Sequence, residues 1–562
     1  MSYKTLENLR VLIVDDQRPF QLLLKGILYS MGATNIAFVM TGEQALWKCM
    51  HGSYDVLFVD YNLGSGKNGR QLLEDLREKK LLHPAAVYMI VTGENQVPMV
   101  VGAIEAEPDD YIIKPFSQSV LRTRLVKIQN RKKQLAPIYQ AMFDDQPELV
   151  IEACKQERQQ GSRYHSLCGR IQAETHLKLK QYDEAEALLS ETLSFSRTNW
   201  ALLLQARLCF EQERYEESLE LCNEAIDTNR YFAEAFDLKA RNLMAQGLMA
   251  EAMEVISQAI VISPFSVSRQ NLLMDIARDM DDLASLVQAS KQIYEITRRA
   301  ARQEVVHLLN YIRTVIDAAS RSEELNQRNK YQQEALMAIH RAKREDTVIR
   351  DFDFDLFETL CQARLESLSG QQYLAKKTFA TVSDRVTAQI EPEPDPENPD
   401  ETPPIPHCAA DAVLLLNQIG EFEQAATLTQ KLQTVSGAID PILEKLFSEQ
   451  QHRSLSRQAS FNELNKQGIQ FYKESNYEQA LLRFEQALEV APMNTGSALN
   501  FIQTAIQMMA DPKRKKPLEL VEKCRKTFRI VDNMPLPEHH KVRHQELLQQ
   551  FNKLKEEKRY SR

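Results

Sequence analysis

The sequence predicts two kinds of fold in one chain: a doubly wound α/β domain with a parallel sheet in residues 1–130, and an all-α helical array after it. In the first part, five short apolar runs alternate with five segments that carry helix signals. Such alternation is typical of a parallel sheet covered by helices. From about Leu135 onward there is almost no strand-like alternation, and glycine is scarce, with 17 residues in the whole chain. Helices are therefore expected in the second part.

The expected strands and helices of the first part follow one another in pairs. Proline fits the first turn of a helix and glycine fits its end, so Pro19 and Gly32 bound the first helix. The strands are expected at LRVLIVDD (9–16), NIAFVM (35–40), YDVLFVD (54–60), AAVYMIVTG (85–93) and DYIIKPF (110–116). The helices are expected at PFQLLLKGILYSMG (19–32), GEQALWKCM (42–50), GRQLLEDLREK (69–79), VPMVVGAIEA (97–106) and SQSVLRTRLVKIQ (117–129).

Polar side chains follow the apolar runs at the points where the strands should end. Four consecutive apolar residues, Val56 to Val59, suit a strand buried on both faces, and Asp60 follows them. The other strand ends carry Asp15 with Asp16, Thr92 and Lys114. Ligands of open parallel sheets bind in the crevice beyond the carboxyl ends of the strands. We therefore expect these side chains to converge on one functional site.

The residue types in this predicted site determine the chemistry that it can perform. Three carboxylates placed together repel one another unless a cation lies among them, and oxygen ligands favour a hard divalent ion such as Mg²⁺. An aspartate such as Asp60 can attack a phosphoryl group and form an acyl phosphate. Lys114 can neutralise the phosphoryl oxygens and Thr92 can donate a hydrogen bond to one of them.

The stretch from Leu9 to about Asn130 resembles the receiver domain of two-component response regulators, through the separated motifs VDD, FVDYN, VTG and YIIKPF. The resemblance implies five parallel strands in the order 2-1-3-4-5. It also implies that Asp60 is the phosphoacceptor, phosphorylated by a sensor histidine kinase. The cofactor Mg²⁺ is then held by Asp15, Asp16 and Asp60, and by the backbone carbonyl of Asn62.

The same resemblance implies a switch beside the phosphoacceptor. Thr92 is the switch hydroxyl, Lys114 contacts the phosphoryl group, and Tyr111 is the aromatic residue whose ring reorients with Thr92. Lys114-Pro115 corresponds to a cis peptide bond of the family. Asn62 and Glu94 match the pair found in chemotaxis-type receivers, so we expect a short-lived phosphorylated state.

The helical part contains internal repeats. Ala206 and Ala240 lie 34 residues apart, as do Ser218 and Ala252, so the register is kept between two successive units. These units resemble tetratricopeptide repeats, which have this period and place small residues where two helices cross. The best single match is Phe461–Asn494. Stacked units of this kind form a solenoid whose concave surface binds a protein partner.

The expected domain division follows from these patterns and from one unusual segment. Residues 391–406 contain seven prolines and six acidic residues in sixteen positions, which predicts a linker or loop. The expected divisions are a receiver domain at 1–130, repeat-like helices at 131–390, the linker at 391–406 and further repeat-like helices at 407–562. Pro137 is expected to break or kink the helix that connects the first two.

Composition excludes several classes of protein. The net charge of -9 argues against a general nucleic-acid-binding role. There is no apolar run near twenty residues and no charged-then-apolar leader, so we expect no membrane insertion and a cytoplasmic location. The eight cysteines show no CxxC pair or metal-ligand spacing, and most are expected to be small buried residues.

We therefore interpret the chain as a bacterial response regulator whose helical array gives a protein–protein interaction output. No enzymatic activity is expected beyond Mg²⁺-dependent self-phosphorylation and autodephosphorylation at Asp60. Two alternatives remain open: a constitutive scaffold whose receiver only docks, and a phosphatase or kinase modulator of another two-component protein. The run KRKK at 513–516 leaves local nucleic-acid binding as a third. A homodimer is also considered, since receiver and repeat surfaces both commonly pair.

Overall fold

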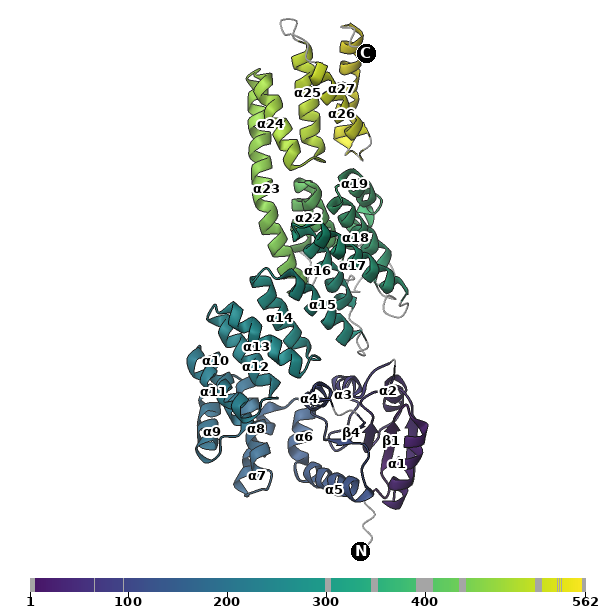
Figure 1. Ribbon diagram of the computed structural model, residues 1–562, viewed down its shortest axis with the longest axis vertical. Coiled ribbons are helices and arrows are strands. Elements are labelled where there is room, and N and C mark those ends of the chain that lie inside the picture. The colour runs from purple at the N-terminus through teal and green to yellow at the C-terminus, as the bar shows by residue number, and fades with distance from the viewer. Residues whose placement is uncertain are drawn as a thin grey trace. The chain divides into compact units, whose positions relative to one another are not determined.

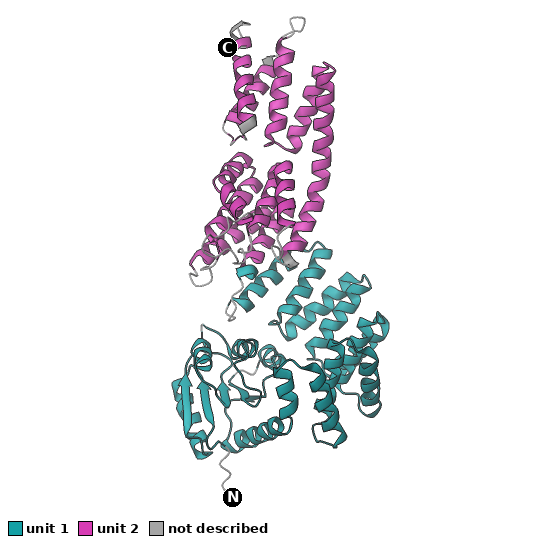
Figure 2. Cartoon of the chain, turned by 180° about the vertical axis from the view of Figure 1, so that it is seen from behind, with its two compact units in different colours: residues 1–307 teal, residues 308–562 magenta. Residues whose placement is uncertain are grey.

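A computed structural model gives the architecture of the chain (Figure 1). It describes residues 6–64, 66–93, 96–298, 305–344, 352–390, 408–433, 441–510, 518–532, 534, 536 and 538–557. The predicted linker at 391–406, the KRKK run and Glu94 lie outside these residues. The chain divides into two compact units, residues 1–307 and 308–562 (Figure 2).

The first unit begins with a five-stranded parallel sheet in the order β2-β1-β3-β4-β5, which confirms the predicted order. The strands are β1 (Arg10–Val14), β2 (Asn35–Val39), β3 (Val56–Val59), β4 (Val87–Thr92) and β5 (Asp110–Ile113). All four residues of β3 are buried, as its continuous apolar sequence predicts. The helices between the strands are α1 (Arg18–Ser30), α2 (Gly42–Met50), α3 (Gly69–Glu78), α4 (Val97–Glu105) and α5 (Gln118–Gln134).

Successive residues of β3 contribute to two different hydrophobic cores, one on each face of the sheet. Val56 and Phe58 pack with α1 and α5, through residues such as Leu24 and Leu121. Leu57 and Val59 pack with α2, α3 and α4 on the opposite face. Because side chains alternate across a strand, one apolar strand supplies both cores. The sheet is therefore covered by helices on both faces.

The helix after the sheet breaks near the predicted proline. Helix α5 ends at Gln134 and α6 (Ala136–Phe143) begins after a single residue, with Pro137 in its first turn. Antiparallel helical hairpins follow. They are built from α7 (Pro147–Gln159), α8 (His165–Lys178), α9 (Tyr182–Phe195), α10 (Asn199–Glu211), α11 (Tyr215–Thr228), α12 (Ala233–Ala245), α13 (Met249–Ile262), α14 (Val267–Asp279) and α15 (Leu283–Thr297).

The repeated small residues lie where these helices cross. Ala206 and Ala240 are fully buried, and so are their partners Ser218 and Ala252 on the second helix of each hairpin. Ser218 Oγ donates to the carbonyl of Ala206 at 2.7 Å, which satisfies its hydroxyl inside the crossing. The 34-residue register therefore reports a packing constraint of the hairpins.

The second unit is also helical. Its helices are α16 (Val305–Arg321), α17 (Leu325–Arg344), α18 (Phe354–Leu368), α19 (Gln372–Ala380), α20 (Ser383–Ile390), α21 (Ala409–Ile419), α22 (Phe422–Gln433), α23 (Pro441–Lys473), α24 (Tyr477–Val490), α25 (Thr495–Ala510), α26 (Leu518–Asp532) and α27 (Glu538–Glu557). Gly468 permits a close crossing in the best-matching repeat, because a Cβ there would lie under 3 Å from the ring of Phe484. Among the described helices, none is long and apolar enough to cross a membrane.

Candidate functional site

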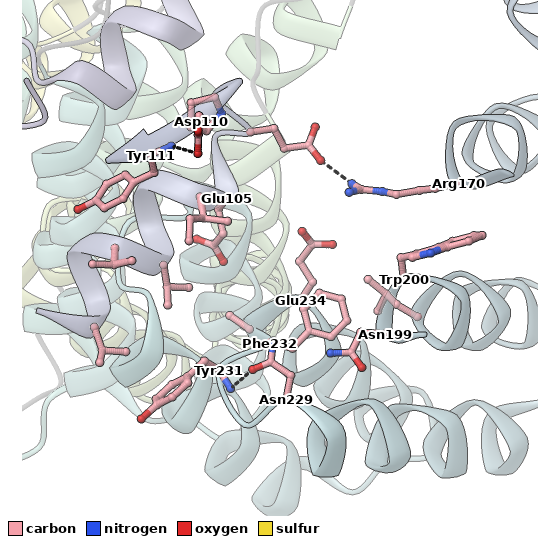
Figure 3. A pocket seen from close by; sticks show the side chains of 18 of the residues that line it. Glu105, Asp110, Tyr111, Arg170, Asn199, Trp200, Asn229, Tyr231, Phe232 and Glu234 are labelled. Carbon is pink, nitrogen blue, oxygen red and sulfur yellow. Dashed lines mark hydrogen bonds and ion pairs between the residues drawn. The ribbon is translucent and has the colours of Figure 1, made fainter. Parts of the chain in front are cut away.

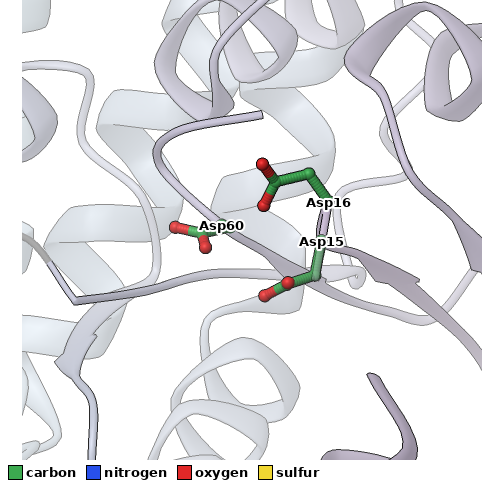
Figure 4. A group of neighbouring side chains, drawn as sticks. All are labelled: Asp15, Asp16 and Asp60. Carbon is green, nitrogen blue, oxygen red and sulfur yellow. The ribbon is translucent and has the colours of Figure 1, made fainter. Parts of the chain in front are cut away.

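Three carboxylates meet at the carboxyl edge of the sheet (Figure 4). Asp15 and Asp16 follow β1, and Asp60 follows the neighbouring β3. The backbone amide of Asp60 donates to the carbonyl of Val14 at 2.8 Å, so the two strand ends are held side by side. Carboxylate oxygens of the three side chains lie within 4.8 Å of one another. The convergence predicted from the sequence is therefore present in the fold.

Lys114 extends from the end of β5 to the same carboxylates. Its Nζ lies 2.7 Å from Asp15 Oδ2 and 2.8 Å from Asp60 Oδ2. The backbone amide of Lys114 donates to the carbonyl of Thr92 at 2.7 Å, and the following bond to Pro115 is cis. The ammonium group also lies 3.8 Å from the centre of the Phe20 ring. Lys114 thus pairs its one positive charge with two of the three carboxylates.

Burial makes this cluster electrostatically demanding. The Asp15 side chain is 2% exposed, and burial raises the pKa of its carboxyl group; Lys114 lowers that pKa and Asp60 raises it further. A carboxylate is harder to charge in such a site because water no longer solvates it. The cluster therefore favours a further cation at the site.

The donor set fits a hard divalent cation such as Mg²⁺. Asp15 Oδ1 accepts a hydrogen bond from the amide of Gln17 at 2.8 Å, which fixes the orientation of this carboxylate. Asp60 Oδ1 accepts one from the amide of Asn62 at 3.3 Å, so Asn62 lies directly beside the cluster. Asp16 is exposed and faces solvent. Carboxylate oxygens, one of them open to water, are the ligands that Mg²⁺ prefers.

The two predicted switch residues lie on neighbouring strands. Thr92 ends β4, is 1% exposed and pairs in register with Ile113 of β5. Tyr111 lies on β5 in register with Ile90, and its ring is half-buried. Tyr111 also lines a large cavity beside the sheet. Thr92 therefore lies on the strand next to β3, and Tyr111 lies on the edge strand β5.

Helix α4 begins five residues after Thr92, and its last residue is held by the repeats. Glu105 Oε1 lies 2.7 Å from Arg269 Nη2, on the first turn of α14, and its other oxygen accepts a hydrogen bond from Ser263. Arg269 also forms a two-pronged ion pair with Asp237 of α12, at 2.7 and 2.9 Å. We call Glu105, Arg269, Asp237 and Ser263 the α4 clasp.

The α4 clasp is buried and strongly ionic. The Arg269 side chain is 1% exposed. Burial opposes its charge, but hydrogen bonds with Asp237 and Glu105 raise the pKa of the guanidinium above its ordinary value. A buried charge is costly when it loses a partner. Arg269 therefore holds the carboxylates of Glu105 and Asp237 in place.

Two further contacts join the sheet domain to the repeats of the same unit. A Cβ on Gly102 of α4 would lie 2.8 Å from the Phe265 ring, so the helix and the α13–α14 corner approach closely. Gln71 Nε2, on α3, donates to the carbonyl of Ile296 at 2.8 Å. Both α3 and α4 therefore contact the helical array directly.

Between α4 and the repeats lies a cavity of about 1120 Å³ (Figure 3). One wall is formed by α4 and β5, and the other by α8, α10 and the start of α12. Figure 3 shows Trp200, Phe232 and Tyr231 from the repeats on the side opposite Glu105 and Tyr111. Arg170 forms an ion pair with Glu107 across the cavity. We call this space the α4 cavity.

The sequence predicted the carboxylate cluster but not the α4 clasp. A signal was present in the repeat register: Arg269 stands 34 residues after Ala235 and 68 after Ala201. Both alanines are fully buried. An arginine at a position where two earlier units bury alanine needs ionic partners, and it has them in Asp237 of the repeats and Glu105 of α4.

Comparisons with known proteins match two separate parts of the chain. Residues 11–126 match the family described as response regulator receiver domain, and residues 172–235 match a tetratricopeptide repeat family. The chemotaxis protein CheY of Pseudomonas aeruginosa is 33% identical over 123 residues, 22% of this chain and 98% of that protein. CheY-3 of Vibrio cholerae is 32% identical over 125 residues, 22% of this chain and 95% of that protein.

Among solved structures, a two-component response regulator from Clostridium difficile is 25% identical, with a TM-score of 0.20. That similarity covers 22% of this chain and 98% of that one. A receiver domain of DrrB activated with BeF3 is 22% identical, with a TM-score of 0.19 over 22% of this chain and 97% of that one.

Proposed function

The chain belongs to the response regulator family through its receiver domain, and from this premise we propose that it transmits a signal by accepting a phosphoryl group on Asp60. The observation that carries the proposal is the meeting of Asp15, Asp16 and Asp60 with Lys114 at the carboxyl edge of the sheet. Asp60 is the member that follows the central strand β3. A partner histidine kinase is the proposed phosphoryl donor.

In the proposed reaction, a carboxylate oxygen of Asp60 attacks the phosphorus of a phosphohistidine. The new oxygen–phosphorus bond forms as the nitrogen–phosphorus bond breaks, and the imidazole leaves with the electron pair. Asp15, Asp16, Asp60 and the Asn62 carbonyl would hold Mg²⁺, which would supply positive charge to the phosphoryl oxygens. Self-phosphorylation and autodephosphorylation at Asp60 are the only reactions that we propose.

Lys114 and Thr92 have distinct proposed roles in this reaction. Lys114 already contacts Asp60, so its ammonium group is placed to pair with a phosphoryl oxygen once Asp60 is modified. Thr92 donates its hydroxyl to another phosphoryl oxygen, and Tyr111 follows that movement on the neighbouring strand. The short life of the phosphorylated state stays a prediction, since it depends partly on Glu94.

The helical repeats are the proposed output. Their match to the tetratricopeptide family supports a protein–protein interaction surface. The α4 clasp supports coupling, because a movement of Thr92 reaches α4 within five residues and Glu105 is held by Arg269. Phosphorylation is thereby proposed to change how the repeats present themselves to a protein partner or to a second copy of the chain.

The test compares wild type with Asp60→Asn in the presence of Mg²⁺ and a small phosphodonor. Intact-mass measurement is expected to show one added phosphoryl group in wild type and none in the variant. The mass in solution, measured with and without beryllofluoride, then reports self-association. Equal phosphoryl incorporation in both proteins contradicts the assignment of Asp60.

A further inference from the structure

The α4 cavity has one wall that is unusually apolar for an uncovered surface. Helix α4 reads VPMVVGAIE, and only Gly102 and Ala103 of it are buried. Ile104 is 54% exposed, and Ile113 of β5 extends the same surface. A helix that is apolar around most of its circumference normally packs against another element. This wall is therefore suited to cover by an additional apolar surface.

The opposite wall is aromatic and comes from three repeat helices or their ends. Trp200 and Leu203 lie on α10, and Tyr231 and Phe232 precede α12. All of these side chains line the α4 cavity, and the indole of Trp200 lies against α8, where its Nε1 donates to Ser166 Oγ at 3.2 Å. Rigid aromatic side chains lose little entropy on contact and dominate binding surfaces. An inserted segment would thus contact apolar groups on two sides.

The groups that line the α4 cavity are mainly acidic. Six carboxylates line it, against the two guanidinium groups of Arg170 and Arg207: those of Glu105, Glu107, Asp109, Asp110, Glu174 and Glu234. The cations that pair with three of these carboxylates do not line the cavity: they are Arg269 for Glu105, Arg131 and Lys132 for Asp109, and Arg124 for Asp110. The charged groups that line the space are therefore mostly negative, and each of these carboxylates is also paired with a cation.

Glu234 shows the effect of this crowding. Burial raises the pKa of its carboxyl group; Arg207 and Arg170 lower it, and Glu105 and Glu107 raise it again. Its contact with Arg207 is long, at 3.9 Å. An added cation near Glu234 would relieve the repulsion between these carboxylates.

The size of the α4 cavity limits the kind of occupant. A helix about 10 Å wide that rises 1.5 Å per residue fills roughly 120 Å³ per residue. A cavity of about 1120 Å³ therefore holds roughly nine residues of helix, two to three turns. This is a suitable length for an amphipathic helix that places anchors at i, i+3, i+4 and i+7 in a groove.

We propose that the α4 cavity binds a short, basic, amphipathic helix of a partner protein, which contacts receiver and repeats at once. The inference rests on the proposed function only in naming the partner of its protein-interaction output. The apolar face of the helix packs between α4 and Trp200, and its lysines or arginines face Glu174 and Glu234.

Trp200 supplies a direct readout. The chain has two tryptophans, and Trp47→Phe leaves Trp200 as the single one. The probe is a peptide of about twelve leucines and lysines whose leucines share one helical face. We expect a saturable change in Trp200 emission. A peptide of the same composition in scrambled order, and one with glutamate in place of lysine, are expected to bind at least tenfold more weakly.

A pair of charge-matched variants locates the binding. Ile104→Lys places a cation in the α4 cavity, on a side chain already half exposed. Phe195→Lys makes the same charge change at a side chain that is 85% exposed and does not line the cavity. We expect Ile104→Lys to weaken peptide binding at least tenfold and Phe195→Lys to change it less than twofold. Circular dichroism checks that both variants fold.

Several outcomes overturn the proposal. They are equal binding of the ordered and scrambled peptides, equal affinity in Ile104→Lys and Phe195→Lys, and an unchanged Trp200 signal. The protein could also form a dimer that the Ile104→Lys substitution dissociates and the peptide leaves intact. That result would assign the cavity to a second copy of the chain instead. The titration needs no phosphodonor. A protein that phosphorylates at Asp60 but binds no peptide therefore keeps its proposed function and loses this inference.

Discussion

Glu105, the last residue of receiver helix α4, lies 2.7 Å from the guanidinium group of Arg269, a repeat side chain 164 positions further along the chain. The same guanidinium group is held by Asp237, so receiver and repeats share one buried cation. Since α4 follows the proposed switch residue Thr92, we propose that a change at the receiver site reaches the repeats through this pair.

The first prediction concerns this pair. Glu105→Gln keeps the shape of the side chain but removes its charge, so Arg269 retains only Asp237 as an ionic partner. Loss of a charge-assisted hydrogen bond costs roughly 1.5–3 kcal/mol. We expect amide hydrogen exchange in residues 97–105 and 263–269 to rise about tenfold or more, with little change in the strands of the sheet.

Glu107→Gln is the matched control. It removes the ion pair between Glu107 and Arg170, and both of these side chains are substantially exposed. Exposed pairs contribute about 0–1 kcal/mol, so exchange should change only a few-fold. If Glu105→Gln and Glu107→Gln raise amide exchange in α4 equally, the buried α4 clasp stabilises this helix no more than an exposed ion pair does.

The second prediction concerns Gly102. Gly102→Ala places a Cβ 2.8 Å from Cδ2 of the Phe265 ring, and overpacking of this kind costs about 1–3 kcal/mol. The gain in helix propensity, about 1 kcal/mol, offsets part of that cost. We expect amide hydrogen exchange in α4 to be faster in Gly102→Ala than in wild type. In the double variant Gly102→Ala with Phe265→Leu, the exchange rate should return toward that of wild type. An unchanged rate of amide exchange in α4 of Gly102→Ala would show that the Phe265 ring shifts to admit the Cβ at little cost.

The third prediction follows from the buried carboxyl group of Asp15. Burial raises the pKa of Asp15 above 3.8, so the folded state holds this proton more tightly than the unfolded state. The stability that this group contributes is complete below pH 3.8 and is lost as the pH rises through the higher folded value. At neutral pH and without metal, Asp15→Asn should therefore raise the thermal midpoint, whereas exposed Asp16→Asn should change it less.

Addition of Mg²⁺ should make the thermal midpoint of wild type higher than that of Asp15→Asn. A cation that binds only the folded state stabilises it by mass action, and Asp15 is one of its proposed ligands. The thermal midpoint of wild type should rise with Mg²⁺, and that of Asp15→Asn should respond much less. A variant that gains as much from Mg²⁺ as wild type would remove Asp15 from the ligand set.

The sheet and its carboxylate cluster could be predicted because their causes are local. Buried strands such as Val56–Val59 are continuous apolar runs, and parallel pairing brings their ends to one edge. Asp15 and Asp60 then meet whatever the rest of the chain does. The small residues at Ala206 and Ala240 could be predicted for a similar reason, since each repeat packs against its neighbour.

The α4 clasp could not be predicted because its cause is not local. No pattern near Glu105 indicates a partner in α14, and the repeat register marks Arg269 as unusual without indicating which helix supplies its partner. Their meeting depends on the accumulated curvature of the repeats between them, which a repeat register does not specify. The same holds for Arg313 and Asp411 of the second unit, buried partners 98 positions apart.

The fourth prediction concerns Lys114, which contacts Asp15 and Asp60 at 2.7 and 2.8 Å. Lys114→Gln keeps a hydrogen-bond donor but removes the charge proposed to stabilise the phosphoryl oxygens during transfer. Loss of one such stabilising group slows a reaction by roughly a hundredfold or more. We expect phosphorylation by a small phosphodonor with Mg²⁺ to slow by about that factor, measured from intact mass over time. Arg at this position keeps the charge, so Lys114→Arg should retain more of the rate; equal losses in both variants would mean that shape rather than charge governs the role of Lys114.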